Sequence, residues 1–466
     1  MERTEGMKMA DTSLGRREIY IYGLGDLASN LSWNMISGFL LYFYTDVAGI
    51  AIAATGTLML FSRVLDALID PAIGAVMDRT KSRYGKARPY LLYGPIPFAI
   101  LFIALFLVPF HSEPARLIYA YVTLIAIGLV YSFVNLPYTA LMALMTRSTH
   151  KKMQLGSTRT IGSAVGTFVV TATTLPLVHY FGPDKRRGFA TTATLFAVIA
   201  TVLFFIVFAN CRERYEEHAV RTRGSLGRSL RDLMHNGPWA ATFIFAALIL
   251  VRLGALIATT IYFAMDVLHK PWLISILLPI ISLSYGLAAV FAPAYFKRFG
   301  IRKGNVIALL VGAGIFALLP FFEGKIWVFV AIYTASSLAV GLCPTSAFAM
   351  TADAVDYQQW KFGTRDDGLL FSSISLSTKV GMAAGASFVA YVLAWAHFNP
   401  AQITLPVAQT IRHLYYWLPP VLMIIQIIPV MFYGLDKLHP EIVRELASRS
   451  EMHLDPTTLS AEDADI

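Results

Sequence analysis

The chain has 466 residues, of which 56% are hydrophobic and only 14% are charged. Soluble domains carry about 25% charged residues, so this composition excludes a disordered protein and argues against an ordinary soluble enzyme. The net charge of +9 would suit nucleic-acid binding only if the basic residues clustered on one surface, and two cysteines far apart fit neither a disulfide framework nor a zinc site.

Most of the chain consists of long apolar runs, which predict an all-α membrane protein. Each run has about 20 residues or more, enough to cross a hydrocarbon core of about 30 Å. The runs are helices rather than barrel strands, because they are long, uniformly apolar and must satisfy their own backbone hydrogen bonds in lipid. We expect twelve transmembrane helices, at residues 19–45, 50–77, 89–110, 116–145, 153–181, 188–210, 238–264, 272–295, 305–322, 327–349, 368–397 and 415–434.

The positive charges predict the orientation of these helices. With the N-terminus in the cytoplasm, 27 of the 38 Lys and Arg residues fall in cytoplasmic segments, seven in outer loops and four inside helices. This excess is the positive-inside pattern. The basic balance therefore reflects membrane topology rather than nucleic-acid binding, and we expect both termini in the cytoplasm.

An internal repeat divides the chain. Two short basic turns, DRTKSRYGKARP (78–89) and YFKRFGIRKGN (295–305), lie six helices apart. Parallel repeats of this kind are typical of transporters with a substrate site near the bilayer midplane. We expect a cytoplasmic N-terminal segment, two six-helix halves joined by a central loop, and a polar, mobile cytoplasmic tail. In chain order these parts are residues 1–18, 19–210, 211–237, 238–435 and 436–466.

The sharpest cluster of charges inside a helix lies in the second predicted span. Asp66 and Asp70 are four residues apart, so both carboxylates lie on one helix face, and Arg63 precedes Asp66 by three residues. Two neighbouring carboxylates repel each other when ionised, and a bound cation or proton relieves that repulsion. We therefore assign Asp66 and Asp70 to a cation-coupling site. The alternative is that Asp66 pairs with Arg63 and Asp70 organises the bend at Pro71.

The first predicted helix carries a polar stripe. Asp26, Asn30 and Asn34 recur every four residues, and Trp33 lies close to the same face. Amides bond to sugar hydroxyls and aromatic rings cover the apolar faces of a pyranose, so we assign Asn30, Trp33 and Asn34 to a substrate site. The alternative is hydrogen bonding between helices, which such side chains commonly provide in membrane bundles.

The fourth predicted helix adds polar residues to both sites. We assign Ser132 to the cation site and Asn135, Tyr138 and Thr139 to the substrate site.

Three further charged residues, Arg159, Arg252 and Lys379, also lie inside predicted helices. Charges at this depth are costly and mark functional sites. We expect Lys379 to point toward the carboxylates of the second helix. Arg252 either binds an anionic substrate, pairs with a carbonyl or reaches the membrane surface. Gly162 and Gly166, close to Arg159, are expected to pack against a neighbouring helix.

The cytoplasmic connection Ala352–Gly368 is dense in charge. Asp353, Asp356 and Arg365 suit the ion pairs of an inner gate, although a solvated loop would have the same composition. The chain shows no metal-ligand spacing, phosphate loop or nucleophile motif, which argues against an enzyme.

At these motifs the chain resembles the glycoside-pentoside-hexuronide:cation symporters. This branch of the major facilitator superfamily includes the melibiose and glucuronide carriers. The resemblance spans about Tyr22 to Leu438 and rests on YFYTDVAG, RVLDALIDPAIG with SRYGKARPY, YSFVNLPY, and ADAVDYQQWKFGTR followed by Lys379. The segments YGLGDLASN and YSFVNLPY are closer to the glucuronide branch.

The resemblance implies the major facilitator fold and a symporter of the bacterial inner membrane, with a central sugar site beside a cation site. By motif position, Asp66 and Asp70 match the cation-site carboxylates. Arg159 and Lys379 match the charged residues that line the sugar cavity and link it to the cation site.

Two departures from the melibiose carrier bear on specificity. Asn30 and Asn135 stand where that carrier has aspartates that bind galactoside hydroxyls, and this loss of negative charge suits an anionic hexuronide without excluding a neutral glycoside. Ile69 stands where that carrier has a sodium-binding asparagine, which favours protons over sodium.

We therefore expect a symporter that imports a glycoside, with a hexuronide such as a glucuronide favoured, by alternating access. The coupling ion is H⁺, with Na⁺ as the alternative. Protonation of Asp66 and Asp70 would release Lys379 and Arg159 to engage the sugar, and Arg63 would take part in coupling.

The expected partners are a small sugar and the lipid bilayer, with no nucleic acid, no metal or other cofactor, and a monomeric chain. The alternatives are a sodium-coupled carrier of another glycoside, a pentoside or a lysolipid and, in a different class, a sugar-sensing membrane receptor.

Overall fold

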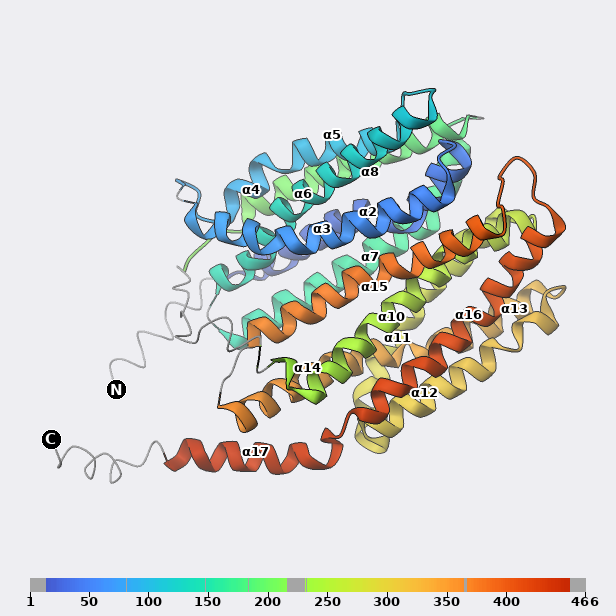
Figure 1. Cartoon of the computed structure of the whole chain (residues 1–466). Helices are drawn as coiled ribbons and strands as arrows, with labels where there is room; N and C mark the ends of the chain where they lie inside the picture. The colour runs from blue at the N-terminus through green and yellow to red at the C-terminus, as the bar shows by residue number, and fades with distance from the viewer. Residues whose placement is uncertain are drawn as a thin grey trace. The chain divides into compact units, whose positions relative to one another are not determined.

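The computed structural model of the chain describes residues 14–80, 82–146, 148–182, 184–215, 231, 233–363 and 367–452. Within these ranges every regular element is a helix and no strand is present (Figure 1). Nine of the described helices are long and apolar enough to cross a membrane, and two shorter apolar helices cover Pro95–Leu105 and Lys379–Trp395. The expected all-α membrane architecture is confirmed, whereas the number of twelve spans stays a prediction.

The N-terminal part of the chain is a series of helices, of which several begin at a capping residue or a proline. They are α2 (Arg16–Tyr42) with a short π-helix η1 (Phe43–Val47), α3 (Ile52–Arg79), α4 (Arg88–Tyr93), α5 (Pro95–Leu105), α6 (Glu113–Met145), α7 (Thr149–Tyr180) and α8 (Lys185–Asn210). Asp184 caps α8, because its side chain accepts a hydrogen bond from the Arg186 N–H at 3.0 Å. Gly94 and Pro95 separate α4 from α5.

The C-terminal part of the chain is also a series of helices with short helical turns between them. They are α10 (Gly237–Tyr262) with a π-helix η2 (Phe263–Val267), η3 (Pro271–Leu273), α11 (Ile274–Phe299), α12 (Ile301–Phe316), η4 (Leu319–Phe322), α13 (Ile326–Val340), α14 (Leu342–Phe362), α15 (Asp367–Trp395), α16 (Leu405–Phe432) and α17 (Leu435–Met452). Gly300 joins α11 to α12 with a φ of 75°, a left-handed conformation that glycine adopts without strain.

Two segments expected to be irregular are helical. α14 continues to Phe362 and so includes most of the charged connection, and Gly363 ends it with a φ of 71°. The tail expected to be mobile forms α17 through Met452, so that expectation is wrong for these residues. Leu438, Ile442 and Leu446 recur at helical spacing in α17, and Ile442 is buried.

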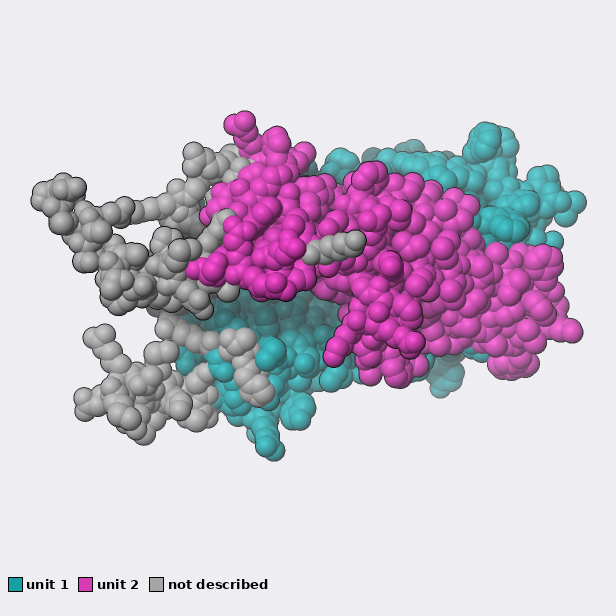
Figure 2. Space-filling model, turned by 90° about the horizontal axis from the view of Figure 1, so that it is seen from below, with its two compact units in different colours: residues 1–220, 253–283, 382–418 teal, residues 221–252, 284–381, 419–466 magenta. Residues whose placement is uncertain are grey.

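The chain forms two compact units, which Figure 2 shows in different colours. The first unit comprises residues 1–220, 253–283 and 382–418, and the second comprises residues 221–252, 284–381 and 419–466. The first unit thus contains α2 to α8 together with parts of α10, α11, α15 and α16. The division into two six-helix halves stays a prediction.

In the first unit, α2 packs closely on α7 through glycines. A Cβ atom at Gly162 would lie 2.1 Å from the Gly23 carbonyl oxygen, and one at Gly166 would lie 2.9 Å from the Cβ of Asn30. Any side chain at Gly162 would push the two helices apart. The predicted packing role of Gly162 and Gly166 is confirmed, and this packing brings the polar stripe of α2 beside Arg159.

Candidate substrate and cation sites

An ion pair between α2 and α7 anchors the candidate substrate site. Arg159 Nε donates to Asp26 Oδ2 at 2.5 Å, and Arg159 Nη2 donates to Asp26 Oδ1 and to Thr139 Oγ1, both at 3.3 Å. The Tyr138 hydroxyl lies 3.0 Å from Asp26 Oδ2 and 2.6 Å from the Tyr22 carbonyl oxygen, its two available acceptors. Arg159, Tyr138 and Thr139, which were all assigned to the substrate site, therefore meet around a carboxylate that was not assigned. Their role in binding a substrate stays a prediction.

The amides of the polar stripe bond partly within their own helix. Asn30 Nδ2 donates to the Asp26 carbonyl oxygen at 2.8 Å, and Asn34 Nδ2 lies 2.9 Å from the Asn30 carbonyl oxygen. Asn34 Nδ2 also lies 3.0 Å from Thr167 Oγ1 on α7, so hydrogen bonding between helices accounts for part of its role. Asn135 on α6 accepts a long hydrogen bond of 3.5 Å from Ser29.

The predicted cation cluster has a buried ion pair at its centre. Arg63 Nη1 lies 3.2 Å from Asp66 Oδ2, and both side chains are less than 10% exposed. The Asp66 carboxylate also lies against the backbone of α6, because a Cβ atom at Gly128 would be 2.1 Å from its Oδ1. The alternative in which Asp66 pairs with Arg63 is therefore seen in the geometry, and Gly128 is a member of the cluster that the sequence did not reveal.

The second carboxylate of the cluster bonds to α6. Ser132 Oγ donates to Asp70 Oδ1 at 2.7 Å. Asp70 on α3 thus meets the serine that was assigned with it to the cation site. A hydroxyl and two carboxylates are the oxygen ligands that a hard cation prefers, and the carboxylates can equally bind protons.

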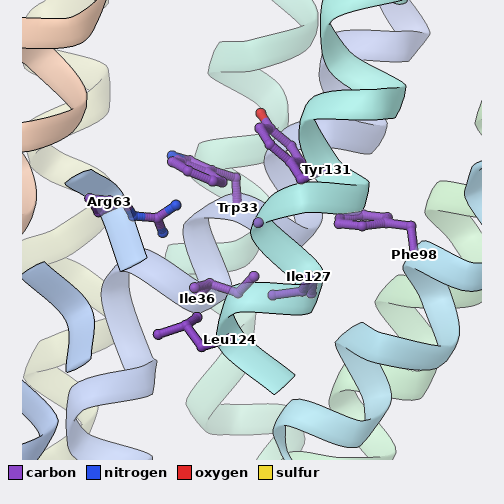
Figure 3. A pocket seen from close by; sticks show the side chains of 8 residues that line it. Trp33, Ile36, Arg63, Phe98, Leu124, Ile127 and Tyr131 are labelled. Atoms are coloured by element: carbon purple, nitrogen blue, oxygen red, sulfur yellow. The ribbon is translucent and has the colours of Figure 1, made fainter. Parts of the chain in front are cut away.

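Trp33 links the two candidate sites. Its indole ring lies 3.8 Å from the Arg63 guanidinium carbon and stacks on Tyr131, with ring centroids 4.6 Å apart. Figure 3 shows these side chains around a small cavity that is otherwise lined by apolar residues, among them Phe98 and Ile127. Trp33 thus contacts Arg63 of the candidate cation site and stands on the same helix, α2, as the polar stripe.

The remaining predicted residues lie in the second unit. Lys379 is half-buried on α15, and its expected approach to Asp66 and Asp70 stays a prediction. Arg252 is only 1% exposed, so it does not reach the surface, and its partner is the Tyr285 hydroxyl at 3.1 Å rather than a carbonyl oxygen.

The carboxylates of the predicted inner gate contact the segment from the end of α16 to the first turns of α17. Asp353 accepts a short hydrogen bond from the Tyr433 hydroxyl, and His439 Nε2 lies 3.0 Å from Asp356 and 3.4 Å from Asp353. Arg365, the proposed basic partner, lies outside the described residues. The sequence did not reveal Tyr433, which follows α16, or His439 on α17. The apolar spacing of α17 was a signal for the helix itself but not for its contacts.

Asp26 and Gly128 were also not assigned to a site from the sequence. Asp26 begins the four-residue repeat of the stripe, which was a usable signal. Gly128 has no such signal, because its role is to leave room for a side chain 62 positions away.

A family model described as MFS/sugar transport protein matches residues 21–437. The chain is 33% identical to the isoprimeverose transporter of Lactiplantibacillus pentosus, over 93% of this chain and 91% of that protein. It is 33% identical to the glucuronide carrier protein homolog of Escherichia coli (strain K12), over 94% and 97% of the two chains. It is 30% identical to the inner membrane symporter YicJ of the same strain, over 84% and 86%.

A solved structure shares the fold. The nucleoside transporter NupG superposes with a TM-score of 0.63 at 14% identity, covering 90% of this chain and all of that one.

Proposed function

Because the chain belongs to the MFS/sugar transport family, we propose that it is a cation-coupled symporter that imports a hexuronide, such as a glucuronide, together with protons. Relatives that are themselves sugar carriers or symporters cover most of its length, which supports sugar symport across a membrane. It is a multi-pass membrane transporter and not an enzyme.

The observation that carries the coupling proposal is the position of Trp33. It touches the guanidinium of Arg63, which is paired with Asp66, and it stands on the helix that bears Asp26, Asn30 and Asn34. A proton on Asp66 would remove the charge that holds Arg63. Arg63 would then shift relative to Trp33, which would change the substrate face before the carrier moves between its two access states.

Two observations bear on the charge of the substrate. Arg252 is a buried guanidinium, and no carboxylate pairs with it in the described part of the chain, which supports an anionic substrate. Arg159 is already neutralised by Asp26, and this pair favours a neutral glycoside such as isoprimeverose as the second candidate.

The proton is proposed as the coupling ion because Ile69 offers no oxygen between the two carboxylates. Sodium prefers several oxygen ligands, and Asp66, Asp70 and Ser132 are those that the cluster supplies. We also propose that the protein lies in the bacterial inner membrane, as does its relative YicJ by name, and that it is a monomer. The 27 basic residues in the predicted cytoplasmic segments support a cytoplasmic location of both termini.

Proteoliposomes with imposed gradients test the proposal. A pH gradient should drive uphill uptake of methyl glucuronide, while a sodium gradient at equal pH should not. Entry of an anionic sugar with one proton is electrically neutral, so a membrane potential should have little effect. For a neutral sugar carried with one proton, 100 mV would add accumulation of roughly 50-fold. Uptake of isoprimeverose but not of glucuronide would refute the hexuronide, and uptake of neither would refute the function.

A further inference from the structure

The first unit contains a cavity of about 1040 Å³ that is separate from the candidate sites above. It is lined by the end of α2, by the π-helical turns η1 and η2, by residues of α7 and α8, and by residues of the 271–275 and 400–401 segments. None of Arg63, Asp66, Asp70 or Arg159 lines it. A cavity of this size is large enough for a small organic ligand.

Two carboxylates enter this cavity from segments that repeat each other. Tyr42 to Val47 (YFYTDV) and Tyr262 to Val267 (YFAMDV) have the same residues at four of six positions, and each contains a π-helical turn. The turns close alike, since the N–H groups of Ala48 and Leu268 donate to the carbonyl oxygens five residues earlier, at 2.8 and 2.9 Å.

The repeat places Asp46 and Asp266 at equivalent positions. The two turns also touch each other, because the hydroxyls of Thr45 and Tyr262 lie 2.9 Å apart. π-Helical turns inside α-helices occur frequently at functional sites. The cavity is therefore lined by two carboxylates at equivalent positions of two π-helical turns that contact each other.

The described residues donate few hydrogen bonds to these two carboxylates. Asp46 accepts from Thr45 at 2.6 Å, and Asp266 Oδ2 is buried with no hydrogen-bond partner among the described residues. Lys185 also lines the cavity, but its Nζ donates to the Tyr42 hydroxyl at 3.0 Å. No ion pair shorter than 4.0 Å joins Lys185 to Asp46 or Asp266 in the part of the chain that the structure describes.

We propose that this cavity is a second saccharide site, a vestibule that holds the sugar outside the site formed by Asp26 and Arg159. A polyhydroxylated ring can donate hydroxyl hydrogens to the two carboxylates and accept a hydrogen bond from the Lys185 ammonium. Trp272 lines the cavity and is 47% exposed, and an indole ring can cover the apolar face of a pyranose. A buried acceptor without a donor is costly, and ligand hydroxyls would relieve that cost at Asp266. The inference rests on the proposed sugar transport for the class of ligand.

Fluorine NMR on the full chain in nanodiscs can observe the two sites separately. With 5-fluorotryptophan incorporated, Trp33→Phe and Trp272→Phe identify the resonances of the inner site and of the vestibule. Titration with isoprimeverose, and separately with methyl glucuronide, should shift both resonances with different apparent affinities. Asp46→Asn combined with Asp266→Asn should weaken the Trp272 titration at least tenfold and leave the Trp33 titration unchanged. Glu113→Gln, an exposed carboxylate outside the cavity, is the matched control.

A second variant tests the vestibule independently if the Asp46→Asn, Asp266→Asn variant does not fold. Ser275→Phe narrows the cavity without removing a charge and should also abolish the Trp272 titration. A Trp272 resonance that does not titrate, or that titrates equally in the Asn variants, overturns the vestibule while transport stands. If Trp272 titrates normally but no uptake occurs in proteoliposomes, the vestibule stands and the proposed function fails.

Discussion

Gly128 on α6 lies directly against the carboxylate of Asp66 on α3. A Cβ atom at Gly128 would be 2.1 Å from Asp66 Oδ1 and 2.8 Å from the carboxylate carbon, well inside any real contact. The glycine therefore decides where the Asp66 carboxylate sits, and through it where Arg63 and Trp33 lie. Gly128 is thus a positioning residue for the proposed coupling site.

Gly128→Ala tests this relationship. The added methyl group would displace the carboxylate or separate the helices, at a cost of about 1–3 kcal/mol. We expect gradient-driven accumulation of sugar to fall at least tenfold, while exchange of labelled for unlabelled sugar persists. Gly74→Ala on α3 is the control, because a Cβ atom there meets nothing within 4 Å. Normal accumulation in Gly128→Ala would show that the position of Asp66 is not critical.

Asp66→Asn should abolish uphill uptake and leave exchange. It should also destabilise the protein by about 1–3 kcal/mol, because the buried Arg63 keeps its charge and loses its anionic partner. Arg63→Gln combined with Asp66→Asn removes the stranded charge, so thermal unfolding should recover in the double variant. Undiminished uphill uptake in Asp66→Asn would exclude the coupling role.

Asp26→Asn tests the charge of the substrate. The change releases the Arg159 guanidinium from its carboxylate partner, so affinity for a glucuronide should rise relative to that for a neutral glycoside. A change of about tenfold in the ratio corresponds to about 1.4 kcal/mol. Competition binding of methyl glucuronide and isoprimeverose measures the ratio. An unchanged or opposite ratio would mean that Arg159 does not contact the anionic group of the substrate.

Ile69→Asn tests the choice of coupling ion. An amide oxygen one residue before Asp70 adds an oxygen ligand to the cluster, so sodium should stimulate uptake in the variant at a fixed pH. Ile69→Leu is the control because it changes the shape of the side chain at equal size and adds no oxygen. Stimulation by sodium in the unmodified protein would contradict the proposed proton coupling.

Some residues of the candidate site can be identified from patterns within a short stretch of the sequence. Asp66, Arg63 and Arg159 were singled out as candidates because charged residues in apolar runs are rare and costly. The packing role of Gly162 and Gly166 followed from their four-residue spacing. A local signal can also be missed, as in α17. Its polar composition led to the expectation of a mobile tail, although Leu438, Ile442 and Leu446 recur at helical spacing.

The sequence by itself determined that this is an all-helical membrane protein of a recognisable transporter family, because hydropathy and backbone hydrogen bonding act over short stretches of chain. Only the tertiary structure decided that Asp26 is the partner of Arg159, that Gly128 holds Asp66, and that Asp46 and Asp266 share one cavity. These residues are 62 to 220 positions apart. The packing of one helix on another brings them together, and no local pattern in the chain specifies which helices meet.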